Sequence, residues 1–347
     1  MTNKTRDLSL LAAGLLAFAA PSFAGDGVEK TRGEGQALFD SAVRNGPLRA
    51  KESAGGGAAP APEQRTAAAP VKAAFIGDQG NGAAARSTLE LIKAEDAEVV
   101  FHQGDFDYKD NPEAWDGLIN EVLGPSFPYF ASVGNHDMKA WPGYQRKLAD
   151  RLKKIPGASC EGDLGALSAC RYRGLVFLLM GVDLMKDNDY PAYIRGQLAA
   201  ETAPWKICSW HIPHYLMQVG DKKNVIDWNI YDECRKAGAI IATGHEHSYS
   251  RTGLMEDFAS QRTAPDGAPL RLQKGRTFAF VSGLGGESIR GQSRGGAWWA
   301  SIYTAKQKAD YGALFCTFGS PKTDAASCYF KDIEGRIADS FDLQSLP

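Results

Sequence analysis

Short runs of apolar, β-branched and aromatic residues recur along this chain, and each run ends in a polar block that contains glycine or histidine. Five runs share this form: Val71–Ile76, Val99–His102, Tyr129–Val133, Lys206–Trp210 and Ala239–Thr243. Continuous apolar runs of this length are typical of strands that are buried on both faces, because half-exposed strands alternate instead. The pattern predicts an α/β fold. In such folds ligands bind outside the carboxyl ends of the strands, so the polar blocks form the candidate site.

Helical patterns lie between these strands. Ala83–Glu95 and Asn229–Ala237 place apolar residues on one side at helical spacing, and the second stops at Gly238, a C-terminal cap. Gly143–Lys154 and Ile194–Glu201 are also expected to be helical. Further strands are expected at Leu175–Val182, Thr277–Ser282, Leu314–Phe318, Ser327–Lys331 and Ile337–Phe341. The C-terminal part is therefore expected to be rich in β-structure.

The first 70 residues differ in composition from the rest of the chain. Residues 1–24 combine a basic start, the apolar stretch Leu8–Ala19 and a small-x-small cleavage pattern, so they are expected to be a secretory signal peptide. The apolar stretch is too short for a permanent membrane helix, and no membrane anchor is expected. Residues 25–70 are rich in alanine, glycine and proline and are expected to form a disordered linker. Residues 71–347 would then form one catalytic domain.

Charge and cysteine content narrow the partners and the compartment. The formal net charge is −2, which gives no electrostatic basis for a nucleic-acid partner or an anionic membrane surface. Six cysteines in a chain with an export signal suggest disulfides, and thus a periplasmic or secreted protein. Cys160–Cys170 and Cys316–Cys328 are the favoured pairs because each closes a short loop. Cys208 and Cys234 could form a third pair or remain two buried thiols.

All six histidines lie within four of the polar blocks. These blocks are Phe101–Asp105, Gly134–Asp137, His211–Tyr215 and Gly244–His247, and a further block, Gly77–Gly80, stands upstream. Histidine is the commonest metal ligand in proteins and the usual acid–base group near neutral pH. The concentration of histidine in these loops therefore predicts a metal centre.

Two metal ions about 3.5–4 Å apart can clamp a phosphate ester and activate a water molecule. Such a centre needs a shared oxygen ligand, further anionic oxygens and imidazole nitrogens. Asp105 is the natural bridge, because a carboxylate has two oxygens to share. Asn135 offers an amide oxygen, and imidazole nitrogens come from His211, His245 and His247. In an extended segment His245 and His247 would point to the same side.

The ordered blocks resemble those of the calcineurin-like metallophosphoesterase superfamily. The resemblance rests on Asp78, Gly104-Asp105, Gly134-Asn135-His136-Asp137, His211 and Gly244-His245-Glu246-His247. Gly80 replaces a histidine ligand of the general family, and Tyr108 follows the bridging aspartate, a combination that resembles the purple acid phosphatase branch. Three further stretches are similar to blocks of that branch: His211–Tyr215, Gly244–Arg251 and Val281–Gly286. The resemblance implies a four-layer α/β/β/α sandwich with mixed sheets.

The resemblance also implies a ligand set and roles for two further histidines. One ion, expected to be Fe(III), would bind Asp78, Tyr108, His247 and the bridging Asp105. The other, expected to be Fe(II), Zn(II) or Mn(II), would bind Asp105, Asn135, His211 and His245. His136 would contact the scissile phosphate or protonate the leaving oxygen. His214 is the candidate substrate contact, because the histidine pair that plant members carry near the substrate is absent from Leu216–Asp221.

These residues predict an exported, acid phosphatase-like enzyme. It would hydrolyse small phosphomonoesters by attack of a metal-bound hydroxide on phosphorus. A phosphodiesterase or a nucleotidase could use the same ligands, because the loops around the pocket decide between these substrates. A binding protein that retains the fold without turnover is a further alternative, against which the complete ligand set argues.

Overall fold

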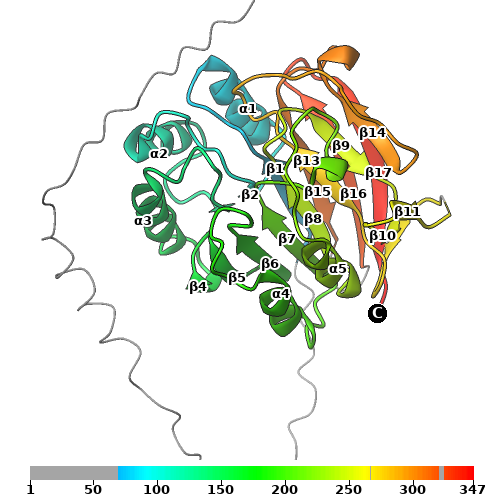
Figure 1. Cartoon of the computed structure of the whole chain (residues 1–347). Helices are drawn as coiled ribbons and strands as arrows, with labels where there is room; N and C mark the ends of the chain where they lie inside the picture. Colours follow the sequence, from blue (N-terminus) through cyan, green and yellow to red (C-terminus); the bar gives the residue numbers. More distant parts are fainter. Residues whose placement is uncertain (1–68, 266, 320–323) are drawn as a thin grey trace, which may run out of the picture. The chain divides into compact units, whose positions relative to one another are not determined.

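The structure is a computed structural model that describes residues 69–265, 267–319 and 324–347 (Figure 1). The expected signal peptide, residues 1–24, and the expected linker, up to residue 68, lie outside the described residues. None of the described helices is both long and apolar enough to span a membrane.

A seven-stranded mixed sheet forms one half of the described fold, in the order β12-β17-β16-β15-β1-β2-β3. Its parallel part is β1 (Val71–Ile76), β2 (Val99–His102) and β3 (Tyr129–Ala131). Antiparallel strands extend it: β15 (Gly312–Phe318), β16 (Ala325–Asp332) and β17 (Ile337–Ser345). The edge strand β12 (Leu270–Leu272) runs parallel to β17.

An eight-stranded mixed sheet forms the other half, in the order β14-β9-β13-β8-β7-β6-β5-β4. Four parallel strands make its centre: β6 (Leu175–Met180), β7 (Trp205–Trp210), β8 (Ile240–Thr243) and β13 (Ala279–Ser282). Antiparallel strands flank them: β4 (Ser159–Asp163), β5 (Leu167–Tyr172), β9 (Tyr249–Thr252) and β14 (Trp299–Tyr303). A small separate sheet pairs β10 (Met255–Asp257) with β11 (Arg262–Thr263).

Helices cover the outer face of each sheet (Figure 1). Those on the seven-stranded sheet are α1 (Ala83–Ala94), α2 (Pro112–Val122) and α3 (Trp141–Leu152), and those on the eight-stranded sheet are α4 (Tyr190–Leu198) and α5 (Trp228–Lys236). Strand β1 shows the layering, because alternate residues face opposite sides. Ala74 and Ile76 pack under the helices, whereas Ala73 and Phe75 face the other sheet. The predicted four-layer α/β/β/α sandwich is confirmed.

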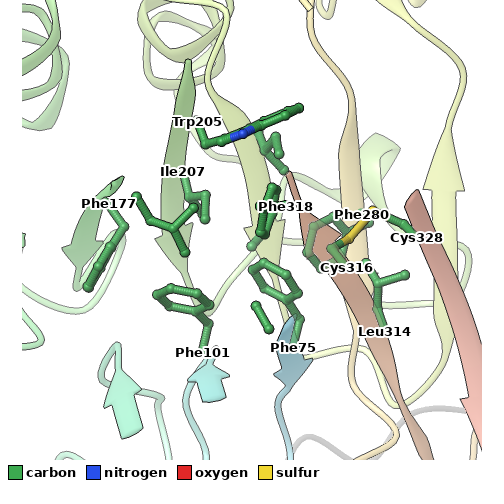
Figure 2. Packing of buried hydrophobic residues seen from close by; sticks show 14 of the residues in the cluster. Phe75, Phe101, Phe177, Trp205, Ile207, Phe280, Leu314, Cys316, Phe318 and Cys328 are labelled. Carbon is green, nitrogen blue, oxygen red and sulfur yellow. A yellow bond between two sulfur atoms is a disulfide. The ribbon is translucent and has the colours of Figure 1, made fainter. Parts of the chain in front are cut away.

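Aromatic side chains fill the space between the two sheets (Figure 2). Phe75 of β1 stacks on Phe101 of β2, with ring centroids 5.2 Å apart, and meets Phe280 of β13 edge-on at 5.3 Å. Phe101 meets Phe177 of β6 at 4.8 Å. Each such pair contributes about 0.5–1.5 kcal/mol beyond the burial of its area. These contacts fix the position of strands of one sheet relative to strands of the other.

The predicted elements are present, with ends that differ by a few residues. The run Tyr129–Val133, for example, is a strand only as far as Ala131. The sequence reading missed α2, although Asn111 caps it by accepting from the amide of Ala114 at 3.1 Å and Pro112 occupies its first position. It also missed the edge hairpin β4–β5 and the short strands β9 to β12 and β14.

All six cysteines are paired in disulfides. The predicted pairs Cys160–Cys170 and Cys316–Cys328 are confirmed, and each joins directly paired residues of two neighbouring strands. The open alternative is decided as well, because Cys208 of β7 is bonded to Cys234 of α5. This third bond ties the outer helix to the centre of the eight-stranded sheet.

Candidate metal centre

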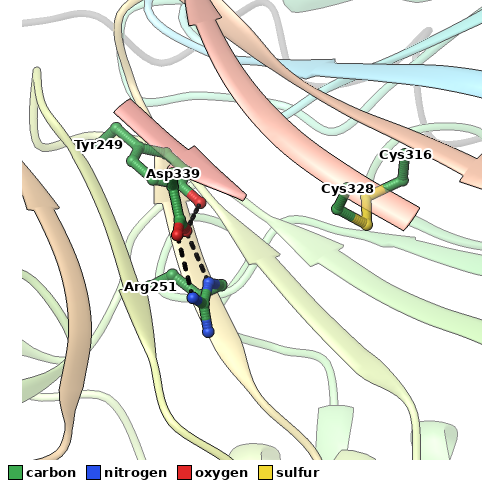
Figure 3. Close-up of a disulfide and its surroundings, with 5 residues drawn as sticks. All are labelled: Tyr249, Arg251, Cys316, Cys328 and Asp339. Carbon is green, nitrogen blue, oxygen red and sulfur yellow. Dashed lines mark hydrogen bonds and ion pairs between the residues drawn. A yellow bond between two sulfur atoms is a disulfide. The ribbon is translucent and has the colours of Figure 1, made fainter. Parts of the chain in front are cut away.

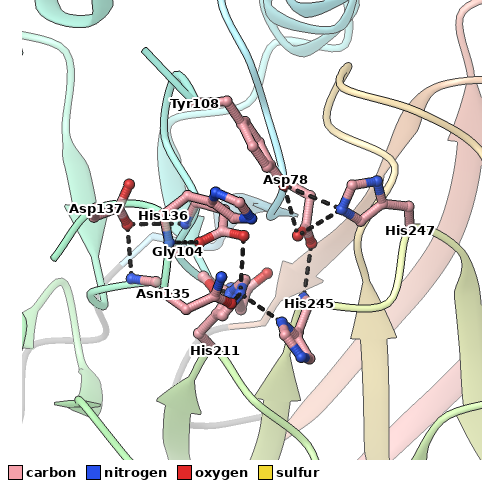
Figure 4. Close-up of polar contacts among 12 residues, drawn as sticks. Asp78, Gly104, Tyr108, Asn135, His136, Asp137, His211, His245 and His247 are labelled. Carbon is pink, nitrogen blue, oxygen red and sulfur yellow. Dashed lines mark hydrogen bonds and ion pairs between the residues drawn. The ribbon is translucent and has the colours of Figure 1, made fainter. Parts of the chain in front are cut away.

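Loops at the carboxyl ends of five strands bring the seven predicted ligands together (Figure 4). The loop after β1 carries Asp78, that after β2 carries Asp105 and Tyr108, and that after β3 carries Asn135; His211 follows β7, and His245 and His247 follow β8. Four of these residues have a left-handed backbone: Asp78, Asp105, Tyr108 and His245, with φ between 56° and 69°. Such conformations are uncommon outside glycine and concentrate at functional sites.

One cluster of ligand atoms is centred on His211. Its Nε2 lies 3.1 Å from Asp105 Oδ2, from Asn135 Oδ1 and from His245 Nδ1. Ligand atoms that share one ion at about 2.1 Å are themselves about 3.0–3.4 Å apart. The other ring nitrogen, Nδ1, lies 2.7 Å from the carbonyl oxygen of Gln103. A carbonyl can only accept, so Nδ1 carries a proton and Nε2 is directed into the cluster.

A second cluster contains Asp78, Tyr108 and His247. The Tyr108 hydroxyl lies 3.1 Å from Asp78 Oδ1 and 3.1 Å from His247 Nε2, and these two atoms are 3.3 Å apart. The Nδ1 atom of His247 is hydrogen-bonded to the hydroxyl of Ser288, which fixes the orientation of the ring. The spacing again fits three ligands of one ion.

Asp105 belongs to the first cluster, and its carboxylate also acts on the Tyr108 hydroxyl of the second. Its Oδ1 accepts a hydrogen bond from the amide of His136 at 2.9 Å. Its Oδ2 is buried and, apart from the contact with His211, has no hydrogen-bond partner among the described residues. A carboxylate withdrawn from water in this way is costly unless a cation or donors compensate it. The donor types and their spacing therefore fit two ions with Asp105 between them.

The pKa shifts of the clustered side chains also indicate a site for cations. Burial would raise the pKa of Asp78, but the nearby His247 outweighs it and lowers that pKa well below its usual value. Burial would lower the pKa of His211, but the Asp105 carboxylate raises it to about 9. Burial and then the Asp78 carboxylate raise the pKa of Tyr108 far above 10, so only a strong cation can convert this phenol to a phenolate.

The family model of calcineurin-like phosphoesterases matches residues 71–249, the segment that carries all of these ligands. The chain belongs to the calcineurin-like phosphoesterase family. The comparison with curated protein sequences gave no match.

Solved structures share the fold at low sequence identity. A purple acid phosphatase from seeds of yellow lupin (Lupinus luteus) is 16% identical with a TM-score of 0.58, over 80% of this chain and 54% of that one. GAP50, the anchor in the inner membrane complex of Plasmodium, is 13% identical with a TM-score of 0.56, over 80% and 90%. PhoD is 12% identical with a TM-score of 0.52, over 80% and 70%. The phosphoesterase described here thus spans about half the length of the lupin protein, and these likenesses concern the fold.

Two aspartates shape the loops of the phosphoesterase centre without joining a cluster. Asp137 accepts from the amides of Asp105 at 2.9 Å, Phe106 at 2.7 Å and Gly134 at 2.7 Å. Asp107 accepts from the amides of Lys109 and Asn111 and from the Tyr144 hydroxyl. Both carboxylates therefore hold backbone in place.

Gly134 allows the loops after β2 and β3 to approach each other. A Cβ atom at this position would overlap with the amide nitrogen and the carboxylate of Asp105. Any other residue would therefore displace the Asp105 carboxylate.

The extended conformation expected for the His245–His247 segment is wrong. His245 has φ 69°, and no strand is assigned between β8 and β9. The left-handed turn sends its ring to His211, whereas the ring of His247 reaches Asp78. The two histidines consequently serve different clusters.

The structure places His136 and His214 in contrasting surroundings. His136 is exposed, and its ring lies against that of Tyr108, with centroids 4.5 Å apart (Figure 4). The ring of His214 is buried against Trp228, with centroids 3.8 Å apart, and its Nδ1 accepts from the amide of Leu216 at 3.1 Å. Burial lowers the pKa of His214 to about 4. His136 is thus at the rim of the centre, whereas His214 lies in an aromatic layer with α5.

The structure also shows partners that the sequence did not single out. Asn224 Oδ1 lies 3.2 Å from His245 Nε2, and Ser288 bonds His247. Each contacts the ring nitrogen that faces away from the cluster, which orients the imidazole ring. Neither Asn224 nor Ser288 belongs to one of the sequence blocks. Their contacts join loops that are distant in sequence, so no local motif could indicate them.

The last residues of the Gly244–Arg251 block support the fold instead of the chemistry (Figure 3). Arg251 of β9 forms two hydrogen bonds with Asp339 of β17, Nε to Oδ2 at 2.7 Å and Nη2 to Oδ1 at 3.0 Å. The Tyr249 hydroxyl also donates to Asp339, at 2.7 Å. This network joins the two sheets directly behind the loop that carries His245 and His247.

Proposed function

We propose that this phosphoesterase hydrolyses phosphomonoesters at a two-ion centre of the purple acid phosphatase type. The observation that carries the proposal is the presence of two neighbouring clusters of ligand-type side chains, one with Asp105 and the other with a tyrosine. In this proposal Fe(III) binds the cluster with Asp78, Tyr108 and His247, because phenolate and carboxylate are hard, charged donors. Fe(II), Zn(II) or Mn(II) binds the cluster with Asn135, His211 and His245, which is poorer in negative charge.

Two ions bound at these ligands would polarise the phosphate and supply a water of low pKa. The chain's own residues hold that chemistry in place. Asp105 spaces the clusters, and Asp137 fixes the loops that carry Asp105 and Asn135. His136 presents an exposed imidazole beside Tyr108, where it would give a proton to the leaving oxygen. The substrate contact proposed for His214 stays a prediction.

Turnover of a phenyl phosphate monoester and of the matching bis-phenyl diester tests the proposal. We expect the purified protein to hydrolyse the monoester faster, and His136→Gln to lower kcat by about a hundredfold or more while both ions are retained. A faster diesterase reaction would favour the alternative substrate class. Inactivity after loading with Fe, Mn and Zn would favour a binding protein of this fold.

Export is part of the same proposal. Residues 1–24 would direct export and be removed, residues 25–70 would link to the catalytic domain at 71–347, and three disulfides are in accord with an oxidising compartment. N-terminal sequencing of the protein from its native host should begin at residue 25. An intact Met1 on the active protein would contradict the export signal.

A further inference from the structure

A fixed loop crosses the metal centre between β7 and α5. The side-chain amide of Gln218 donates a hydrogen bond to the backbone carbonyl of Lys222 at 2.8 Å. The Asn224 carbonyl accepts from the amide of Tyr215 at 2.8 Å, and the Asn224 side chain contacts His245. The backbone of Lys222 is thus held between two anchors, one of which lies on a predicted metal ligand.

The segment after β13 holds the same loop from its other side. Val219 O accepts from the amides of Ser293 and Arg294, each at 2.8 Å, and the Arg294 guanidinium donates to the carbonyls of Gly220 and Asp221. The amide of Arg290 donates to the carbonyl of His247 at 2.9 Å, so this segment is itself fixed to the centre. The backbone of the loop that carries Lys222 is therefore fixed by several hydrogen bonds.

The ammonium of Lys222 is left without a partner. The side chain is half-buried, yet its Nζ makes no hydrogen bond or ion pair with the described residues, whereas the neighbouring Lys223 is exposed to solvent. Burial lowers the pKa of Lys222, the carboxylates of Asp78 and Glu246 oppose that shift, and Arg290 adds to it. Asp78, Glu246 and Arg290 are thus charged groups within electrostatic range of the Lys222 ammonium.

The carboxyl group of Glu246 lies against the same loop. Both of its carboxylate oxygens are buried and have no hydrogen-bond partner among the described residues, and Arg290 Nη1 lies 3.9 Å from Oε2. The carboxylate lies directly on Gly220, where a Cβ atom would overlap with it. The Glu246 carboxyl group is therefore packed between this loop and Arg290.

The charge balance changes when ions bind. Two ions carry more positive charge than Asp78, Asp105 and a phenolate at Tyr108 neutralise. A half-buried ammonium beside that excess is unfavourable unless an anion joins it. A phosphate monoester supplies the missing negative charge, and lysine binds phosphate oxygens as a point charge.

We propose that Lys222 is a substrate-binding residue that contacts a non-bridging oxygen of the phosphate group. This inference rests on the proposed function, because it assigns a further contact within the same site. The adjacent hollow lined by Asp221, Glu246, Arg290 and residues 291–293 lies beside this contact and would receive the organic part of the ester.

Binding of inorganic phosphate to the ion-loaded protein, measured by calorimetry, tests the inference separately from turnover. Lys222→Met should weaken phosphate binding by about tenfold to a hundredfold, with unchanged metal content. Lys222→Arg should retain most of the affinity, and Lys223→Met, the matched control, should leave it unchanged. In turnover, the KM of Lys222→Met should rise more than its kcat falls.

Equal phosphate affinity in Lys222→Met and the wild type would overturn the inference, as would an equal loss in Lys223→Met. A wild-type protein that binds phosphate through Lys222 but hydrolyses no ester would contradict the proposed function and leave the binding role of Lys222 intact.

Discussion

The buried ion pair between Arg251 and Asp339 provides a quantitative test of how the two sheets are joined. Both side chains are largely withdrawn from water, with 7% and 8% of their surface exposed. Asp339→Asn removes the charge but keeps the shape, so the Arg251 guanidinium remains buried without its counter-charge. Loss of one partner from such a pair costs about 3–5 kcal/mol. The Arg251 guanidinium lies 4.0 Å from the centre of the Phe341 ring, which offsets about 0.5–2 kcal/mol of that cost.

We therefore expect Asp339→Asn to lower the free energy of unfolding by about 1–4.5 kcal/mol, measured by urea denaturation with the disulfides intact. The double variant Arg251→Met, Asp339→Leu removes both charges and should be destabilised less than Asp339→Asn, because a buried pair replaced by apolar residues is often nearly neutral. A loss below about 1 kcal/mol in Asp339→Asn would refute the reasoning. So would a double variant less stable than Asp339→Asn.

Three further predictions concern acid stability, a disulfide and the bridging ligand. Burial would raise the pKa of Glu95, but hydrogen bonds from Lys331, Tyr329 and Lys72 lower it to about 2. The stability that Glu95 contributes is therefore present above about pH 4.5 and lost as the pH falls towards 2. Glu95→Gln should be destabilising at pH 7 and neutral near pH 2. Glu90→Gln, on the exposed side of α1, is the control and should show no such trend. Replacement of Cys316 and Cys328 by serine should cost about 3 kcal/mol in thermal or urea unfolding, because the pair closes a short loop; an unchanged midpoint would contradict this. Asp105→Asn should lose both ions and nearly all activity, and full metal content by elemental analysis would contradict a bridging role.

The sequence predicts the central strands and the ligands well because both depend on local patterns. Buried parallel strands such as Val71–Ile76 are continuous apolar runs, and the folded position of such runs follows from burial alone. The ligand residues follow directly at the strand ends, so the position of Asp78 or His211 in the fold is fixed once its strand is placed. The same logic predicts helices Ala83–Glu95 and Asn229–Ala237 to within a few residues.

Elements at the edges of the sheets depend on contacts that no local pattern contains. The strand Ser159–Asp163 is polar and largely exposed, so it has no apolar signal, and it is held by pairing with β5 and by the Cys160–Cys170 disulfide. Helix α2 did have a signal in Asn111-Pro112, which the sequence reading overlooked.

The residues that surround the predicted ligands could not be predicted from the sequence, for a different reason. Asn224 contacts His245 only because the loop after η1 (Tyr215–Met217) folds back over the centre. The left-handed turn at His245 was not predicted either, since such a conformation is uncommon for any residue other than glycine. Long-range packing, and not residue type, decides these contacts.

The most direct test of the two-ion centre is the visible absorption spectrum of the purified protein with metal content determined on the same sample. We predict two ions per chain, one of them iron, and a violet band from the Tyr108 phenolate on Fe(III) that disappears in Tyr108→Phe while the fold is retained. A violet band that persists in Tyr108→Phe would contradict the assignment of this ligand. Fewer than two ions per chain in an active protein would contradict the centre itself.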